Sequence, residues 1–228
     1  MKKIVLIVSL VFGFSMFAQN ESNIALEKQK LNQSKLFSDT NVLISSMYNI
    51  IALEGENSTY KDSLAYVYFN ERNYVSCFLV ANDVLKRNPD NEQMLEIKAI
   101  SLESVGALDK AIEAYQALFV KTNNNYHVYK IAGMQLGLKK FDEALLSVKK
   151  ADQLADTGKI KVAFQVNKNY NQQVALKAAI AYLEGIIFEN LEKKKEAKIA
   201  FERAVSLFPD FVVAKSKLLT IEGNSKKE

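Results

Sequence analysis

Cysteine and histidine, the residue types most used for nucleophilic and metal chemistry, occur once each in this chain. Cys77 and His127 are the one combination that could act as a nucleophile and its base, with the imidazole activating the thiol. Each has a simpler interpretation, because Cys77 stands at a position where small residues recur and His127 stands at the start of a predicted helix. We therefore expect packing roles for both and no catalysis from the pair.

The motifs of other enzyme classes are missing from the sequence. It contains no phosphate-binding GxxxxGK[ST] loop, no GxSxG, no HExxH and no paired CxxC. Carboxylates are numerous, but they are scattered over predicted helix faces without the spacing of a cation-binding loop. The sequence thus predicts a protein that is not an enzyme and that has no metal site and no cofactor.

The composition is that of a folded and mainly helical protein. The chain has 228 residues, of which 49% are hydrophobic and 25% charged, so it is too apolar to be a disordered tail. Its single cysteine excludes an internal disulfide. Only two prolines occur, against a usual share of about 5%, which indicates helix nearly throughout.

The N-terminal segment has the pattern of a secretory signal peptide. Lys2 and Lys3 precede an apolar run at residues 4–14, and polar residues begin after Ala18, where we place the cut. The run is shorter than the roughly 20 residues that span a bilayer. A buried N-terminal helix or an uncleaved anchor is the alternative. The prediction is an exported protein, periplasmic or secreted, with no membrane span after cleavage.

Removal of this segment also changes the charge balance. The full chain has 30 basic and 26 acidic residues, and loss of Lys2 and Lys3 leaves 28 against 26, a net charge of +2. Nucleic-acid-binding proteins usually carry a clustered basic face, and this near-balanced chain has none that the sequence indicates. We expect no nucleic-acid partner.

A pattern of small and apolar residues occurs four times, with successive copies 34, 33 and 53 residues apart. In each copy two small residues stand twelve positions apart: Ala65 and Cys77, Ala99 and Ala111, Ala132 and Ala144, Gly185 and Ala197. Two antiparallel helices approach to about 8 Å only where the facing side chains are small. Pro89 and Pro209 end two of the copies, since proline stops a helix.

This pattern resembles the tetratricopeptide repeat, a helix–turn–helix unit of 34 residues. The resemblance implies an all-α, right-handed superhelical array of antiparallel helix hairpins. The array covers residues 58–221, with units 58–91, 92–124, 125–158 and 178–211 and a capping helix at 210–221. A degenerate repeat or cap at 19–57, with Leu31 and Leu43 at the small positions, precedes it, and a tail at 222–228 follows.

Residues 159–177 are an insertion that breaks the period. Ile160, Val162, Phe164 and Val166 alternate with polar or small residues, a period of two that is typical of a strand. Residues 167–169 have turn chemistry, so a small β-hairpin is predicted here. An extended loop packed on its neighbours is the alternative. As a hairpin, the insertion could cover the groove of the array or pair with a strand of a partner.

In the family, the first helix of each hairpin lines a concave groove, and the resemblance assigns particular residues to it. These candidate groove residues are Asp62, Tyr66, Phe69, Glu96, Glu103, Tyr126, Tyr129, Tyr182 and Glu189. They are aromatic or acidic, which favours an apolar or basic segment or helix as the occupant. The alternative is that some of the rings are packed under neighbouring repeats or under the insertion.

We therefore expect a non-catalytic scaffold or adaptor that binds another protein in its groove in the bacterial periplasm. The alternative is a structural subunit of a cell-envelope complex for secretion or surface assembly, which would use the convex faces and the insertion.

Overall fold

The computed structural model describes the backbone of residues 2–225 and the side chains of residues 19–222. The chain divides into two compact units, Met1–Val105 and Gly106–Glu228. The side chains of the predicted signal peptide, residues 1–18, lie outside the described part, as does the end of the predicted tail, residues 226–228. Within the described part, no helix is both long enough and apolar enough to cross a bilayer.

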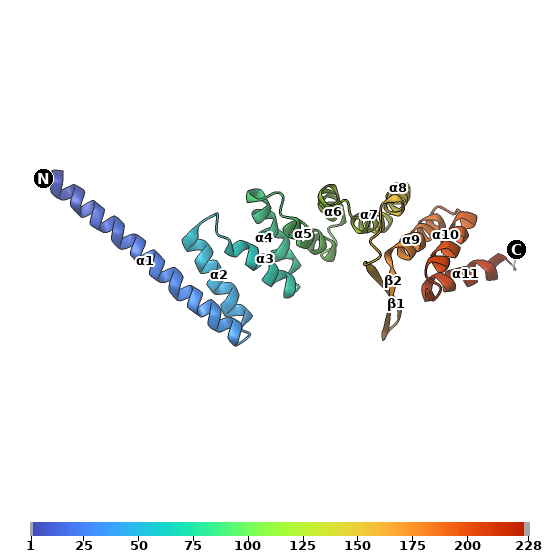
Figure 1. Cartoon of the computed structure of the whole chain (residues 1–228), viewed down its shortest axis with the longest axis horizontal. Coiled ribbons are helices and arrows are strands. Elements are labelled where there is room, and N and C mark those ends of the chain that lie inside the picture. The colour runs from blue at the N-terminus through green and yellow to red at the C-terminus, as the bar shows by residue number, and fades with distance from the viewer. Residues whose placement is uncertain (1, 226–228) are drawn as a thin grey trace. The chain divides into compact units, whose positions relative to one another are not determined.

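The first unit consists of helices that pack as hairpins (Figure 1). Its helices are α1 (Lys2–Leu36), α2 (Thr40–Glu54), α3 (Tyr60–Asn70), α4 (Tyr74–Arg87) and α5 (Glu92–Ser104). α1 packs on α2 and α3 on α4, and α5 packs on α4. Asp39, Asn73 and Asn91 begin α2, α4 and α5, and each side chain accepts a hydrogen bond from a backbone N–H of the first turn.

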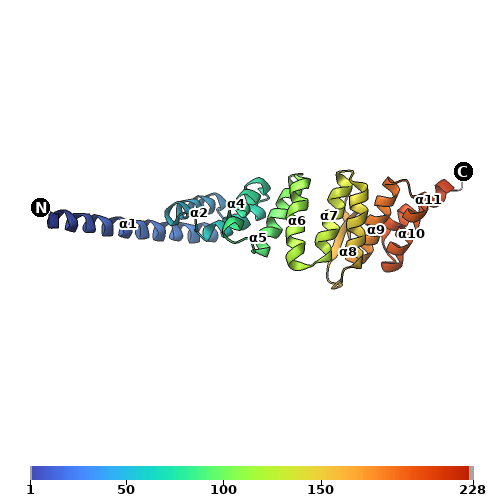
Figure 2. The same cartoon turned by 90° about the horizontal axis from the view of Figure 1, so that it is seen from above.

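The second unit continues the pattern and contains the insertion. Its elements are α6 (Leu108–Thr122), α7 (Asn125–Gly137), α8 (Phe141–Gln153), β1 (Lys161–Asn167), β2 (Tyr170–Ala175), α9 (Leu176–Asn190), α10 (Lys194–Leu207) and α11 (Val212–Ser225). Each helix packs on the next one, and Figure 2 shows α6 to α10 side by side. The predicted all-α fold of helix hairpins is confirmed.

The turns that follow α1, α3, α5, α7 and α9 share one backbone geometry. Ser38, Arg72, Gly106, Lys139 and Glu192 all have a positive φ, between 55° and 76°. In four of these turns the next backbone N–H donates to the carbonyl five residues earlier, at 2.8–2.9 Å, which is the Schellman ending of a helix. The five residues are spaced by 34, 34, 33 and 53 positions, so the turns follow the period of the sequence.

Small residues let the two helices of a hairpin approach each other, as predicted. Ala132 of α7 and Ala144 of α8 are both fully buried. A close contact occurs at Gly185 of α9, where an added Cβ would lie 2.5 Å from Cε1 of Phe201 in α10. Glycine is required at this position because the aromatic ring occupies the space of a side chain.

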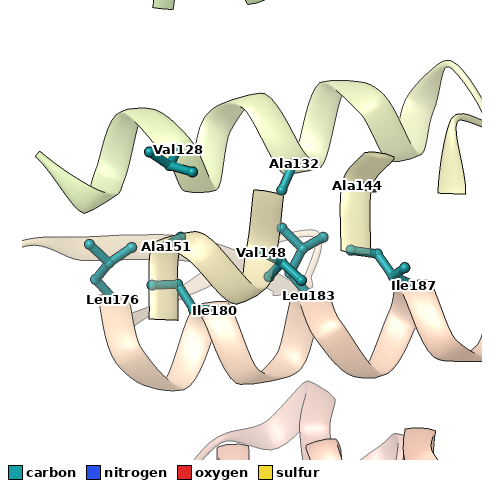
Figure 3. Packing of buried hydrophobic residues seen from close by; sticks show 9 residues of the cluster. All are labelled: Val128, Ala132, Ala144, Val148, Ala151, Leu176, Ile180, Leu183 and Ile187. Carbon is teal, nitrogen blue, oxygen red and sulfur yellow. The ribbon is translucent and has the colours of Figure 1, made fainter. Parts of the chain in front are cut away.

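A core of aliphatic residues joins α7, α8 and α9. Figure 3 shows side chains of α7 and α9 pointing toward α8, which contributes Ala144, Val148 and Ala151. Val148 has no exposed surface. A second cluster in the same unit surrounds Val174 of β2 and Phe211, which precedes α11. The insertion therefore contributes to the core.

The predicted β-hairpin is confirmed. β1 and β2 pair antiparallel, with Val162 opposite Val174 and Phe164 opposite Gln172. The backbone N–H of Leu176 donates to the carbonyl of Ile160 at 3.1 Å, which joins the base of the hairpin to the start of α9. Apolar side chains on β1 are less exposed than the alternating Lys161, Ala163 and Gln165, as the period of two predicts.

Candidate functional site

Cys77 and His127 are both packing residues within their own units. The Cys77 thiol is fully buried in α4, donates to the carbonyl of Ala65 at 3.4 Å, and has its pKa raised by burial. His127, in α7, is buried beside Tyr115, and burial lowers the pKa of its imidazole. These shifts favour a neutral thiol and a neutral ring, the opposite of an activated pair. Among the described side chains, no cluster of three potential metal ligands occurs.

Three of the candidate groove residues of the first unit, Asp62, Tyr66 and Glu96, lie together with Gln93 between α3 and α5. The Tyr66 hydroxyl donates to Oε1 of Gln93 at 2.9 Å. Partial burial, together with the nearby charges of Asp62 and Glu96, raises the pKa of Tyr66. The ring is still 36% exposed. The structure thus brings Asp62, Tyr66, Gln93 and Glu96 together as one acidic and aromatic surface, which we call the α3–α5 surface.

The two acids of this surface differ in their partners. Asp62 accepts from the guanidinium of Arg87 at 2.6 Å, so its charge is partly neutralised. Glu96 is exposed and forms no ion pair with any side chain in residues 19–222. Glu96 therefore carries the uncompensated negative charge of the α3–α5 surface.

Phe69 and Glu103, the other groove candidates of this unit, are half-buried. The Phe69 ring packs edge-on against Tyr74 of α4, with the centroids 6.1 Å apart. Phe69 is thus held in place by the second helix of its own hairpin, and only part of its surface is open to a ligand.

In the second unit, Tyr126 and Tyr129 lie next to each other on α7. Their rings stack with the centroids 6.2 Å apart, and both pack against the α7–α8–α9 core. Each ring remains partly exposed. They form a rigid aromatic pair at the surface of the unit.

Tyr182 and Glu189 on α9 are engaged within the fold. The Tyr182 ring lies 5.2–5.5 Å, centroid to centroid, from the rings of Phe164, Phe201 and Phe211. Burial and the charge of Glu189 raise the pKa of Tyr182. Glu189 itself accepts from Lys217 of α11 at 2.5 Å. Tyr182 therefore fits the alternative stated in the sequence analysis, in which a ring is packed under the insertion.

The apolar side of the insertion faces the helices of its own unit. Ile160 and Val162 pack on the α7–α8–α9 core, and Phe164 packs on the second cluster. Val166, near the tip, is half-buried. The apolar side of the insertion is thus buried on helices of the same chain, where Phe164 packs edge-on against Tyr182.

Sequence reasoning did not single out Gln172, which fixes the insertion to α11. Its Nε2 donates to the carbonyl of Asp210 at 2.6 Å, and its Oε1 accepts from the backbone N–H of Val212 at 3.1 Å. A signal was available, since Gln172 shares the inward side of β2 with Val174. A glutamine on the apolar side of a strand is expected to form specific hydrogen bonds, because buried polar side chains are nearly always hydrogen-bonded.

Comparisons with known proteins identify the fold. No protein-family model and no curated protein matches the sequence. Among solved structures, the MamA protein has a TM-score of 0.62 at 12% identity, with 82% of this chain and 92% of that chain covered. YrrB, described as a TPR protein with an unusual peptide-binding site, has a TM-score of 0.62 at 14% identity, with 82% and 87% covered. Residues 41 to the end of MamA from Desulfovibrio magneticus RS-1 give 0.60 at 13% identity, with 83% and 97% covered. At these identities the likeness shows a shared fold.

Proposed function

We propose that this chain, which has the fold of tetratricopeptide-repeat proteins, is a non-catalytic scaffold or adaptor that binds a segment of another protein. The observation that carries the proposal is the α3–α5 surface, where exposed Tyr66 lies between the charges of Asp62 and Glu96. YrrB, which shares the fold, is described as having a peptide-binding site, and this supports a peptide as the kind of ligand.

The chemistry of the surface favours a basic segment with apolar side chains. The Tyr66 ring offers a rigid apolar face, and its hydroxyl is already held by Gln93, so little conformational entropy is lost on binding. Glu96 supplies a negative charge that no described side chain neutralises. A lysine or arginine next to an apolar residue would satisfy both groups.

Selection of peptides from a random display library against the full chain tests this proposal. We expect enrichment of segments that combine lysine or arginine with apolar residues. Glu96→Lys should weaken binding of the selected peptides by about tenfold, because it turns an attraction into a repulsion. Glu113→Lys, on an exposed face of α6, is the matched control and should leave binding unchanged. Enrichment of acidic peptides, or equal effects of the two substitutions, would contradict the proposal.

A second candidate is a structural subunit of a cell-envelope complex, and one observation favours it. Leu79, Leu146 and Ile199 are exposed, and each lies two residues after the small residue of a second helix. An aliphatic side chain at the same exposed place in three repeats suits a permanent contact better than solvent. Size-exclusion chromatography of native extract separates the two: a mostly monomeric pool supports the adaptor, and constant migration with a large assembly supports the subunit.

We place the protein in the bacterial periplasm, on the strength of the signal-peptide pattern in residues 1–18. Cell fractionation followed by N-terminal sequencing tests this assignment. The expected result is a periplasmic chain that begins at Gln19. A chain that keeps residues 2–18, or one found in the cytoplasm, would overturn it.

A further inference from the structure

A groove of about 550 Å³ lies between β2 and α11 in the second unit. Tyr170 lines it from β2, and Val212 and Leu219 line it from α11. These three side chains are 51%, 42% and 70% exposed. Apolar side chains gathered around one groove are characteristic of an interaction site, whereas single exposed apolar residues are ordinary.

The walls of this groove are fixed relative to each other. Gln172, which also lines the groove, is buried and bonds through both ends of its amide to the backbone at Asp210 and Val212. The Phe164 ring packs on Phe211 with the centroids 4.9 Å apart, immediately before α11. The groove is therefore formed in advance, and a ligand does not have to order it.

The floor of the groove is one face of α11. Val212, Lys215, Ser216 and Leu219 follow the spacing i, i+3, i+4 and i+7, so they lie on one side of the helix. In the repeat frame Leu219 takes the place of Gly185 in α9, which contacts Phe201 of the following helix α10. α11 has no following helix among the described residues, so the face that receives a helix elsewhere in the unit is exposed here.

The charged side chains of the groove indicate which charge its occupant should carry. Lys217 pairs with Glu189, and Lys198 is 3.6 Å from Glu222, but Lys215 forms no ion pair with any side chain in residues 19–222. Asp210 lies at the N-terminal end of α11, where the helix dipole stabilises a negative charge. Lys215 is thus the charge on the floor of the groove that lacks a counter-ion.

The geometry points to a docking site for an amphipathic helix of a partner protein. Its apolar side chains contact Tyr170, Val212 and Leu219, and an aspartate or glutamate on the same face pairs with Lys215. The helix takes the place of the second helix that would complete a hairpin with α11. This site is separate from the α3–α5 surface and does not depend on a ligand there.

Photocrosslinking in the cells that produce the protein tests the inference. The full chain carries p-benzoylphenylalanine in place of Leu219, whose exposure makes the replacement compatible with folding. We expect a discrete adduct, and mass spectrometry of its digest should map the crosslink to a segment with helical apolar spacing and an acidic residue. Lys215→Glu should lower the yield about fivefold, the effect of losing one exposed ion pair and adding repulsion.

Two matched variants complete the experiment. Lys195→Glu makes the same charge change on the exposed surface of α10 and should leave the adduct unchanged. The crosslinker at exposed Ser206 should not give this adduct. The inference is overturned by an adduct to a second copy of this chain, by a mapped segment that is basic or lacks helical spacing, by equal effects of the two lysine substitutions, or by no adduct at Leu219.

Discussion

Gly185 of α9 and Phe201 of α10 are in close contact. The space that a Cβ would need at Gly185 is filled by the Phe201 ring, which is fully buried and packs on Tyr182 with the centroids 5.5 Å apart. Packing at this point is therefore set by the absence of one methyl group.

We expect Gly185→Ala to lower the free energy of unfolding by about 1–3 kcal/mol, the usual range for overpacking a core. Gly133→Ala in α7 is the control, because no atom lies within 4 Å of its added Cβ. That substitution should be neutral or stabilise by up to about 1 kcal/mol, since alanine favours helix. Urea denaturation of both variants measures the difference, and equal effects would show that the ring yields.

His127 makes stability depend on pH. Burial lowers the pKa of its imidazole, and Nδ1 has no hydrogen-bond partner among the described residues. As the pH falls, the imidazole of the unfolded chain is protonated before the buried imidazole of the folded chain. The contribution of the neutral ring to the free energy of unfolding is therefore present above about pH 6.5 and is lost as the pH falls below it. We expect the wild type to lose more stability than His127→Phe between about pH 7.5 and pH 5.5. Parallel urea denaturation curves at the two pH values measure this, and identical losses would exclude His127 as the source.

The turns that follow α1, α3, α5, α7 and α9 can be made more stable by substitution. Each places one residue at positive φ, yet glycine occurs at this point only in Gly106 among the five turns of Ser38, Arg72, Gly106, Lys139 and Glu192. A side chain in the left-handed region costs about 1–2 kcal/mol, which glycine avoids at some cost in the entropy of the unfolded chain.

Glu192→Gly should therefore raise the free energy of unfolding by up to about 1 kcal/mol. Lys195→Gly is the neighbouring control: Lys195 is exposed and lies within α10, where glycine should destabilise by about 0.5–1 kcal/mol. Thermal melts followed by circular dichroism compare the two. A lower melting temperature for Glu192→Gly would contradict the argument.

The β-hairpin is an element that supports α11. Gln172→Ala removes both hydrogen bonds to the start of that helix and leaves the backbone N–H of Val212 without this partner. We expect faster hydrogen exchange at residues 212–216 and a loss of about 1–3 kcal/mol in the free energy of unfolding. Gln173→Ala, one residue along and exposed, should change neither quantity. Exchange that stays slow in Gln172→Ala would show that the second cluster alone holds α11.

For the whole molecule, the period of the sequence was sufficient to predict the helix hairpins, because small residues such as Ala132 and Ala144 must meet where helices approach. The strands of the insertion were predicted from a separate signal, the alternation of apolar residues between Ile160 and Val166. The division into two units after Val105 was not predicted, although it falls inside the predicted unit 92–124. The repeat pattern does not change there, so the division appears only in how the folded backbone packs.

The candidate site was predicted in part, for two physical reasons. Asp62 and Glu96 come together around Tyr66 because neighbouring first helices share a face, which the repeat frame encodes. The groove positions were assigned only to the first helix of each hairpin. They therefore did not include Arg87 of α4, whose guanidinium partly neutralises Asp62. The insertion has no place in the period either, so the sequence offered a cover over some rings as an alternative but did not indicate that the covered ring is Tyr182.

The insertion also changes the order in which the second unit can fold. In a regular array, order spreads between hairpins that are adjacent in sequence. Here α8 and α9 pack directly on each other, although the two strands stand between them in the chain. Strand pairing brings Ile160 next to Leu176 and so shortens the loop that must close before α9 reaches α8. Pairing of the strands should therefore favour the docking of α9 on α8.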